Sequence, residues 1–155
     1  MIIQSRHPSE TRHLAAVLAR ALRAGDCLAL YGDLGAGKTV FAAAVKEALG
    51  VLGEMQSPTF TILRSYVHPA GGPPFHHIDA YRLSDETEWY DLGLDEVAGD
   101  DGIALIEWAD RIEKALPPNT IRIRIDRPDD SDDENRRSVR ITFPEGEPRF
   151  ADLKF

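Results

Sequence analysis

The sequence is poor in cysteine and contains no long apolar run. Cys27 is the single cysteine among 155 residues, so no intrachain disulfide can form, and its place in a short apolar segment predicts a buried thiol without a chemical role. No stretch approaches the roughly 18 apolar residues of a membrane-spanning helix, and residues 1–7 lack the basic start and apolar core of a secretory signal. We therefore expect a cytoplasmic protein with no membrane contact.

Positive charge is also scarce in this chain. Lysine and arginine number 18 against 26 aspartates and glutamates, which gives a formal net charge of −8. This is the wrong sign for a protein that binds a nucleic-acid backbone by itself, so any contact with RNA is expected to be indirect. Part of the acidity gathers at 129–134, where mutual repulsion and the lack of apolar side chains predict a solvated loop.

The remaining composition is that of an ordinary globular protein, with 43 % hydrophobic and 28 % charged residues. A chain of this length can bury about 68–70 % of its unfolded surface and needs no disulfide or metal to fold. We expect a single domain over residues 1–155, in which residues 144–155 form a peripheral tail.

Several segments have the apolar runs or the period-two alternation of β-strands. The apolar run at 27–31 and the one at 103–106 predict strands that are buried on both faces. The other expected strands form a hairpin, at 59–67 and 75–81, and an antiparallel pair that joins 121–125 to 138–143. Parallel and antiparallel strands together indicate a mixed sheet.

Helical periodicity separates these strands. One helix is expected from Pro8 to Gly25 and a second through residues 39–49, and Ser84 is the expected N-cap of a third that extends toward Val97. A short helix after Trp108 should end at residues 117–118, which are both proline. The predicted fold is an α/β protein, a three-layer sandwich with a mixed β-sheet.

The most informative segment lies between the first apolar strand and the second helix. Residues 32–39 read Gly-Asp-Leu-Gly-Ala-Gly-Lys-Thr and match G-x-x-x-x-G-K-[ST], the phosphate-binding loop of P-loop NTPases. Its glycines allow backbone N–H groups to turn toward an anion, and the helix that follows adds the partial positive charge of its N-terminus. The expected contacts to a magnesium nucleoside triphosphate come from Gly32, Asp33, Gly35, Ala36, Gly37, Lys38 and Thr39, with Lys38 on the phosphates and Thr39 on Mg²⁺.

Hydrolysis or transfer also needs a carboxylate near Mg²⁺ and a group that orients the attacking atom. Glu107 follows an apolar strand, at the sheet edge where open α/β sheets bind their ligands, and we assign it to the magnesium shell. Asp79 also ends a strand-like run and is a candidate for positioning water or sensing the γ-phosphate. A surface ion pair with Arg82 is the alternative for Asp79.

Other candidates are less certain from the sequence alone. Thr59 follows a Ser-Pro turn and either offers a hydroxyl to Mg²⁺ or the γ-phosphate or merely begins a strand. Thr11, Ser9 and the arginine pair at 136–137 are candidates for contacts to the adenine ring. Trp89 and Trp108 are expected to be packing anchors, and a relay of the nucleotide state is the alternative for Trp108. His77 and Asp79 lack a third ligand nearby, which disfavours a transition-metal site.

Four segments in this order resemble the TsaE family of bacterial ATPases. They are Gly-Asp-Leu-Gly-Ala-Gly-Lys-Thr at 32–39, Ser-Pro-Thr-Phe at 57–60, His-Ile-Asp-Ala-Tyr-Arg at 77–82 and Ile-Glu-Trp at 106–108. Two departures from the family pattern, Val40 and the alanines at 43–44, fall at positions that contact neither phosphate nor Mg²⁺ in the expected arrangement.

This resemblance implies an ATP-binding protein whose hydrolysis is weak alone and stimulated by partners. The family supports threonylcarbamoyladenosine formation on transfer RNA together with the TsaB and TsaD proteins, so tRNA would be contacted only through that complex. Carried over by position, the resemblance puts Lys38 on the phosphates and Thr39 and Glu107 on Mg²⁺. It also makes Asp79 and Trp108 important for activity and residues 57–59 a switch-like segment.

Two other functions stay open on the sequence alone. A small-molecule kinase would need a mobile lid that carries arginine, whereas Arg122, Arg124 and Arg127 lie on or just after a regular strand. A nucleotide-gated binding module with incidental hydrolysis would share every motif of the loop. A GTPase is disfavoured because the chain has no Asn-Lys-x-Asp segment to read guanine.

Overall fold

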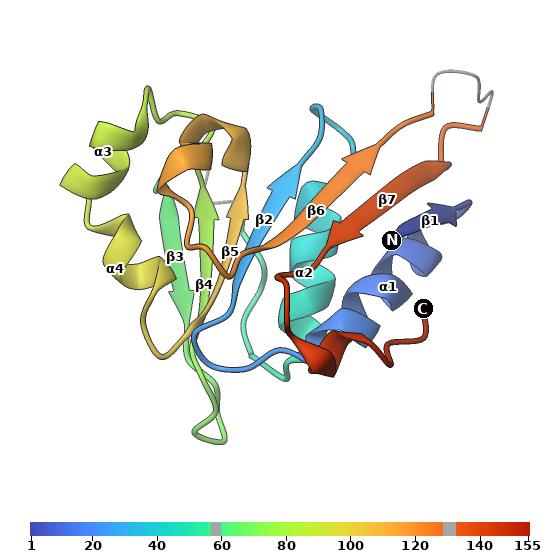
Figure 1. Cartoon of the computed structure of the whole chain (residues 1–155), viewed down its shortest axis with the longest axis horizontal. Helices are drawn as coiled ribbons and strands as arrows, with labels where there is room; N and C mark the ends of the chain where they lie inside the picture. The colour runs from blue at the N-terminus through green and yellow to red at the C-terminus, as the bar shows by residue number, and fades with distance from the viewer. Residues whose placement is uncertain (57–59, 129–132) are drawn as a thin grey trace.

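A computed structural model describes residues 1–56, 60–128 and 133–155 as a mixed α/β fold (Figure 1). Its strands form one sheet in the order β1-β7-β6-β2-β5-β4-β3. The strands are β1 (Ile2–Ser5), β2 (Cys27–Tyr31), β3 (Leu63–Tyr66), β4 (Phe75–Asp79), β5 (Ile103–Glu107), β6 (Ile121–Asp126) and β7 (Arg137–Thr142). The helices are α1 (Pro8–Ala19), α2 (Lys38–Ala48), α3 (Glu86–Asp91), α4 (Leu94–Ala98), and the 3₁₀ helices η1 (Ala109–Ala115) and η2 (Pro148–Phe150).

The centre of the sheet is parallel and its margins are antiparallel, which confirms the expected mixed sheet. Strand β2 runs parallel to both β5 and β6, and β4 runs parallel to β5, whereas β3, β7 and β1 join in antiparallel register. Every residue of β2, β4 and β5 is buried, as expected for strands covered on both faces. The carboxyl ends of these three strands therefore meet at one edge, and Asp79 and Glu107 are direct register partners there.

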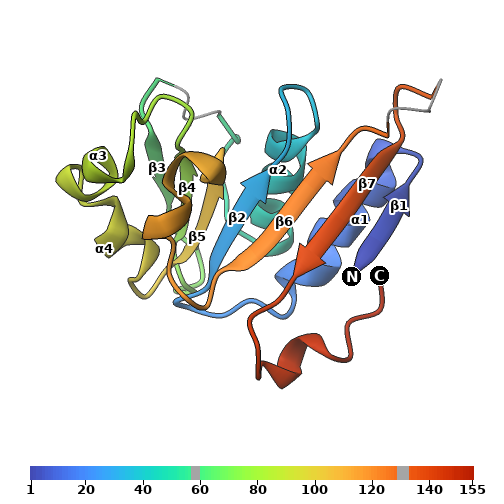
Figure 2. The ribbon, with the colours of Figure 1, turned by 45° about the horizontal axis from the view of Figure 1, so that its top comes forward.

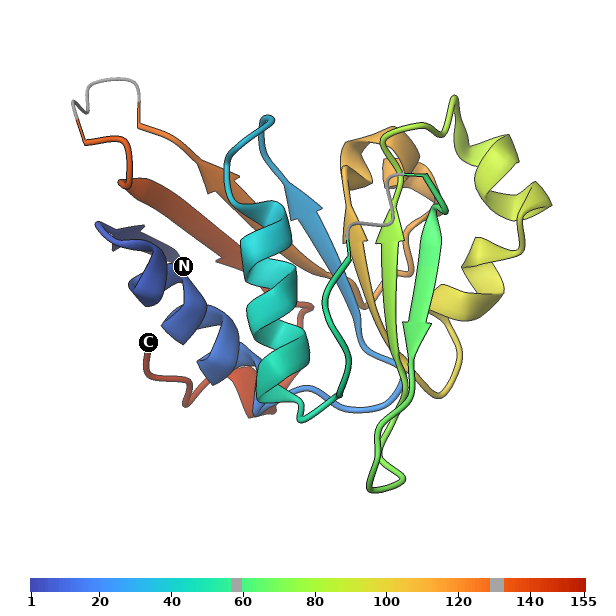
Figure 3. The ribbon, with the colours of Figure 1, turned by 180° about the vertical axis from the view of Figure 1, so that it is seen from behind.

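Helices cover the two faces of the sheet unequally. Helices α1 and α2 pack on one face, over the part formed by β1, β7, β6 and β2 (Figure 3). On the other face, α3, α4 and η1 cover the part formed by β2, β5 and β4 (Figure 1). In the described part of the chain no helix covers the outer face of β6 and β7 (Figure 2), and Arg124 and Arg140 are exposed on it. The three-layer expectation therefore holds at the centre of the sheet, where β2 and β5 contribute to the cores on both faces, and the part with β6 and β7 has two layers.

The expected single helix from Ser84 toward Val97 is wrong in two respects. Asp85, not Ser84, is the N-cap: its Oδ1 accepts the backbone N–H groups of Thr87 and Glu88 at 2.9 and 3.2 Å. Gly93 then divides the segment into α3 and α4, because its φ of 66° lies in the left-handed region that ends helices.

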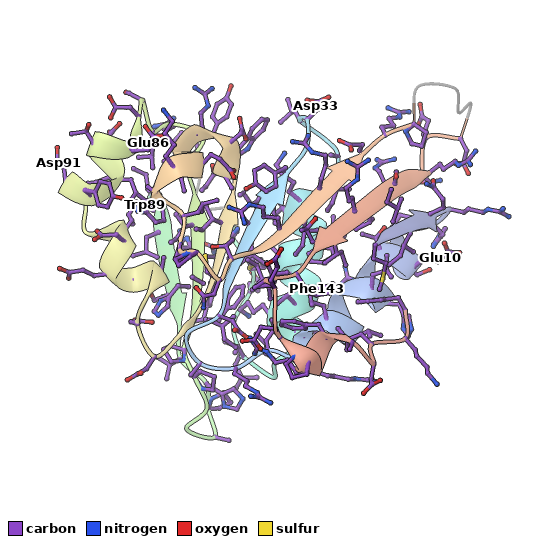
Figure 4. The ribbon with its side chains drawn as sticks, viewed as in Figure 1. Glu10, Asp33, Glu86, Trp89, Asp91 and Phe143 are labelled. Atoms are coloured by element: carbon purple, nitrogen blue, oxygen red, sulfur yellow. The ribbon has the colours of Figure 1, made fainter. Side chains whose placement is uncertain are left out.

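Trp89 is fully buried at the centre of this second layer, whereas Asp91 points outward from the same helix (Figure 4). This confirms Trp89 as a packing anchor. The expected hairpin is also confirmed, although β3 is shorter than expected because Ile62, just before it, has a φ of 64°. The short edge strand β1 is not predicted from the sequence, and it forms by pairing with β7.

The segment after Pro144 is not peripheral throughout. Phe150 is buried in the core beside Phe143, with ring centroids 4.5 Å apart. Arg149 donates two hydrogen bonds of 2.7 Å to the carboxylate of Asp26. None of the helices in residues 1–56, 60–128 and 133–155 combines the length and apolar character that crossing a bilayer requires.

Candidate functional site

The loop between β2 and α2 turns back on itself through three glycines with positive φ. Gly32, Gly35 and Gly37 have φ values of 135°, 78° and 109°. A Cβ at Gly32 would lie 2.1 Å from the carbonyl oxygen of Ile125, so only glycine fits there. Asp33 lies at the tip of the loop, beyond the carboxyl end of β2 (Figure 4). The sequence thus folds locally into the strand-loop-helix unit that its motif predicts.

A cavity of about 330 Å³ opens beside this loop. Four of the side chains that the sequence predicts for the site meet there although they come from three separate segments: Lys38, Thr39, Asp79 and Glu107. Gly35 and Gly37 of the predicted loop also line the cavity, together with Leu34, Val40 and Trp108. The space next to the loop is therefore open as far as the described residues are concerned, because none of their side chains fills it.

Lys38 is the cation of this cavity. Its Nζ donates to the carbonyl oxygens of Gly32 and Asp33, at 2.7 and 2.9 Å, and lies 3.7 Å from the centroid of the Trp108 ring. Burial lowers the pKa of Lys38 from its ordinary value, and nearby carboxylates, Glu107 first among them, act in the opposite direction. The ammonium thus rests on neutral acceptors, which an anionic ligand could replace.

Glu107 is fixed through both of its carboxylate oxygens. Thr39 Oγ1 donates to Oε2 at 3.0 Å, and His77 Nε2 lies 2.8 Å from Oε1. Its backbone carbonyl also accepts the N–H of Ala80, which ties the ends of β5 and β4 together. The two residues predicted to hold Mg²⁺, Thr39 and Glu107, are therefore in direct contact.

Asp79 lies beside Glu107 and is equally buried, at 4 % against 3 % exposure. Its Oδ1 accepts the backbone N–H of Tyr81 at 2.9 Å, which sets the direction of the carboxylate. Arg82, the alternative partner considered for Asp79, holds its guanidinium 4.7 Å from the centroid of the Phe60 ring.

His77 and Trp108 make contacts at this site that the sequence analysis does not predict. The sequence suggests His77 only as half of a metal pair with Asp79, whereas in the structure it contacts Glu107 on the neighbouring strand. The available signal was its position two residues before Asp79, which puts both side chains on one face of β4. Trp108 has a φ of 59° and packs against Tyr81, with centroids 4.9 Å apart, while its ring also contacts the lysine of the loop.

A second, smaller cavity of about 140 Å³ borders the other side of the loop. Thr11 lines it, with its hydroxyl 2.8 Å from Ser5 Oγ, and so does Arg137, whose Nε donates to the carbonyl oxygen of Ala36 at 2.8 Å. Ser9 instead contacts the ring of His7. Of the candidates for adenine contacts, Thr11 and Arg137 are thus the ones that adjoin the loop.

Two further expectations concern Thr59 and Cys27. Thr59 and the Ser-Pro turn before it lie outside the described residues. Cys27 is buried in β2, and burial raises the pKa of its thiol to about 12, which keeps the thiol protonated at neutral pH. The prediction that Cys27 is a buried core residue is confirmed.

Comparisons with known proteins agree on one family. The family model described as "Threonylcarbamoyl adenosine biosynthesis protein TsaE" matches residues 5–139. A tRNA threonylcarbamoyladenosine biosynthesis protein TsaE of Streptomyces coelicolor is 45 % identical over 136 residues, which cover 84 % of this chain and 88 % of the relative. A protein of the same description from Bacillus subtilis is 44 % identical over 128 residues, covering 83 % and 78 %.

A solved structure resembles the whole fold. The crystal structure of Bacillus subtilis YdiB superimposes with a TM-score of 0.78 at 35 % sequence identity and covers 99 % of this chain and 90 % of that one. The similarity therefore extends over the sheet, both helical layers and the loop.

Proposed function

Since the chain belongs to the TsaE family, we propose that it is a P-loop ATPase that binds ATP with Mg²⁺ and serves tRNA threonylcarbamoyladenosine biosynthesis. The observation that carries this proposal is the meeting of Lys38, Thr39, Asp79 and Glu107 in one open cavity beside a glycine-rich loop. The mixed α/β fold, with the loop directly after a buried parallel strand, supports the assignment to P-loop NTPases.

The loop fits a phosphate chain. Apart from their own chain neighbours, no described residue has an atom within 4 Å of where a Cβ of Gly35 or Gly37 would be, so the backbone there can be approached closely. Helix α2 begins at Lys38, and its first N–H groups and its dipole favour an anion at that end. Lys38 can exchange its two carbonyl acceptors for phosphate oxygens without leaving the cavity.

The side chains present also fit Mg²⁺. A threonine hydroxyl and carboxylates are the hard oxygen ligands that Mg²⁺ takes together with nucleotide phosphates. Thr39 and Glu107 would hold the ion, which when bound with ATP neutralises charge on the β- and γ-phosphates. Asp79 is the residue that we assign to orienting the attacking water, because its carboxylate lies beside Glu107 and is aimed by the Tyr81 N–H.

Hydrolysis by the protein alone is expected to be slow, and we propose TsaB and TsaD as the partners that stimulate it. The support for this expectation is that the chain belongs to the TsaE family. The net charge of −8 supports contact with tRNA only through such partners.

Removal of the loop cation tests nucleotide binding. We expect Lys38→Ala to weaken Mg-ATP binding roughly 10- to 100-fold, because charge-assisted hydrogen bonds to the phosphates are lost. The matched control is Lys114→Ala, an exposed lysine on η1 that should leave the affinity unchanged. Isothermal titration calorimetry measures both, and an unchanged affinity in Lys38→Ala would contradict the assignment of the loop.

The hydrolytic part of the proposal needs a separate measurement. Phosphate release by the wild-type protein should be low alone and should rise on addition of TsaB and TsaD. ATP binding without any stimulated turnover would reduce the protein to a nucleotide-gated binding module. Transfer of radiolabelled phosphate to a metabolite would instead favour a kinase.

A further inference from the structure

His77 is completely buried, yet its polar ring contacts the active-site carboxylate rather than a backbone group. The side chain has 0 % exposure, and its Nε2 lies 2.8 Å from Oε1 of Glu107, another buried residue. Strand β4 does not need this contact for its pairing, because its backbone already bonds to β3 and β5. A buried polar side chain is costly unless it has a hydrogen-bond partner, and the partner of His77 is Glu107, the proposed magnesium ligand.

The contact divides the two oxygens of Glu107 between two donors. Oε1 is bonded to His77, so Oε2 is the oxygen that faces Thr39 and the cavity. With both oxygens bonded, the carboxylate cannot rotate without breaking a hydrogen bond in a buried place. The direction of Oε2 is therefore determined before any ligand binds.

The environment of the ring favours one hydrogen arrangement. Nδ1 of His77 has no hydrogen-bond partner among the described residues. A hydrogen on Nε2 therefore gives the ring a donor where its one described hydrogen-bond partner lies, at Oε1 of Glu107. That donor fixes the orientation of Glu107 from the side opposite the Thr39 hydroxyl.

We propose that His77 is a positioning residue that holds Glu107 in the orientation required to bind Mg²⁺ beside Thr39. The proposal rests on the proposed function, since it assumes that Glu107 is a magnesium ligand. Hydrogen-bonded partners of this kind change metal affinity by about 10- to 100-fold in metalloproteins. A histidine that only fills space in the core would affect stability and leave the magnesium dependence of nucleotide binding unchanged.

Two amide substitutions separate these roles. In His77→Gln the amide nitrogen reaches about as far as Nε2, whereas in His77→Asn it reaches only the position of Nδ1 and falls short of Glu107. Calorimetry gives the dissociation constant for ATP with Mg²⁺ and with EDTA in the wild type and in each variant. The dissociation constant with EDTA divided by the one with Mg²⁺ measures how much the ion tightens ATP binding. We expect this ratio to stay near the wild-type value in His77→Gln and to fall at least tenfold in His77→Asn, while the constant measured with EDTA stays unchanged.

The outcomes distinguish this proposal from the one on which it depends. If the wild type binds ATP equally well with and without Mg²⁺, the magnesium assignment of Glu107 itself is wrong. If the wild type shows the dependence and His77→Asn retains it, the role of His77 is wrong while the proposed function stands. Should circular dichroism show that His77→Asn is unfolded, His77→Leu replaces it with the same expectation, and unfolding of both would assign His77 to stability and overturn the proposal.

Discussion

At the scale of single residues, two carboxylates occupy equivalent places and have different surroundings. Asp79 and Glu107 are register partners on parallel strands and are buried to the same degree. Glu107 bonds to the Thr39 hydroxyl, whereas the carboxylate of Asp79 accepts a backbone N–H at the end of its own strand. The bond of Glu107 to Thr39, the other predicted magnesium ligand, is the physical basis for assigning the metal to Glu107 rather than to Asp79.

Substitution of each acid should therefore have a different kinetic consequence. We expect Glu107→Gln to abolish the tightening of ATP binding by Mg²⁺, because the neutral amide is a poor ligand for a hard cation. Asp79→Asn should bind Mg-ATP like the wild type and lose turnover about 100-fold or more, since its role would be exercised during the reaction. Titration calorimetry and phosphate release separate the two effects. A large loss of Mg-ATP affinity in Asp79→Asn would instead show that Asp79 is a magnesium ligand.

At the scale of elements, the second helical layer is built from short pieces. Helix α3 has six residues and is too short to be stable by itself, so it depends on its N-cap and on the burial of Trp89 against the sheet. Asp85 satisfies two backbone N–H groups at its start, and Glu86 and Glu88 add negative charge to the first turn. Capping and one large apolar side chain thus hold this layer in place.

The cap makes a measurable contribution to stability. Asp85→Ala should lower the free energy of unfolding by about 1 kcal/mol, because two N–H groups at the start of α3 lose their acceptor. The matched control is Asp91→Ala, an exposed acid at the other end of the same helix, which should be neutral or slightly stabilising. Urea denaturation measures both variants. Equal effects of the two substitutions would contradict the capping assignment.

At the scale of the whole molecule, the end of the chain closes over the start of β2. Arg149 on η2 bonds through two nitrogens to Asp26, and the side chains are 15 % and 6 % exposed. The Asp26 carboxylate raises the pKa of Arg149, chiefly through these hydrogen bonds. Asp26 also accepts the backbone N–H of Arg23, so the pair ties the tail to the turn that leads into β2.

Loss of this pair should be costly because it leaves a buried carboxylate without its cation. We expect Arg149→Met to lower the free energy of unfolding by about 2–3 kcal/mol, measured by urea denaturation. Lys154→Met, an exposed lysine of the same tail, is the control and should have little effect. Adding Asp26→Asn to Arg149→Met should recover part of the loss, because the buried charge is removed as well. An additive double variant would show that the two side chains do not interact.

The sequence by itself determined the features that arise within a few consecutive residues. The glycine-rich turn between β2 and α2, the apolar strands on either side of the site and the antiparallel pair β6–β7 all follow from local spacing, and the structure agrees with each of them. It also indicated that Lys38, Thr39, Asp79 and Glu107 would meet, because parallel strands bring their carboxyl ends to one edge. Glycine geometry, side-chain alternation and helical periodicity are properties of a short segment, so they can be read without knowing its neighbours.

Only the tertiary structure decided which distant residues touch. The bond from His77 to Glu107 depends on β4 lying next to β5, and the burial of Phe150 depends on the tail crossing the end of the sheet. The open face of β6 and β7 depends in the same way on how the sheet is covered. Such contacts join positions tens of residues apart, and their free energy comes from burial and charge pairing that exist only once the strand order is fixed.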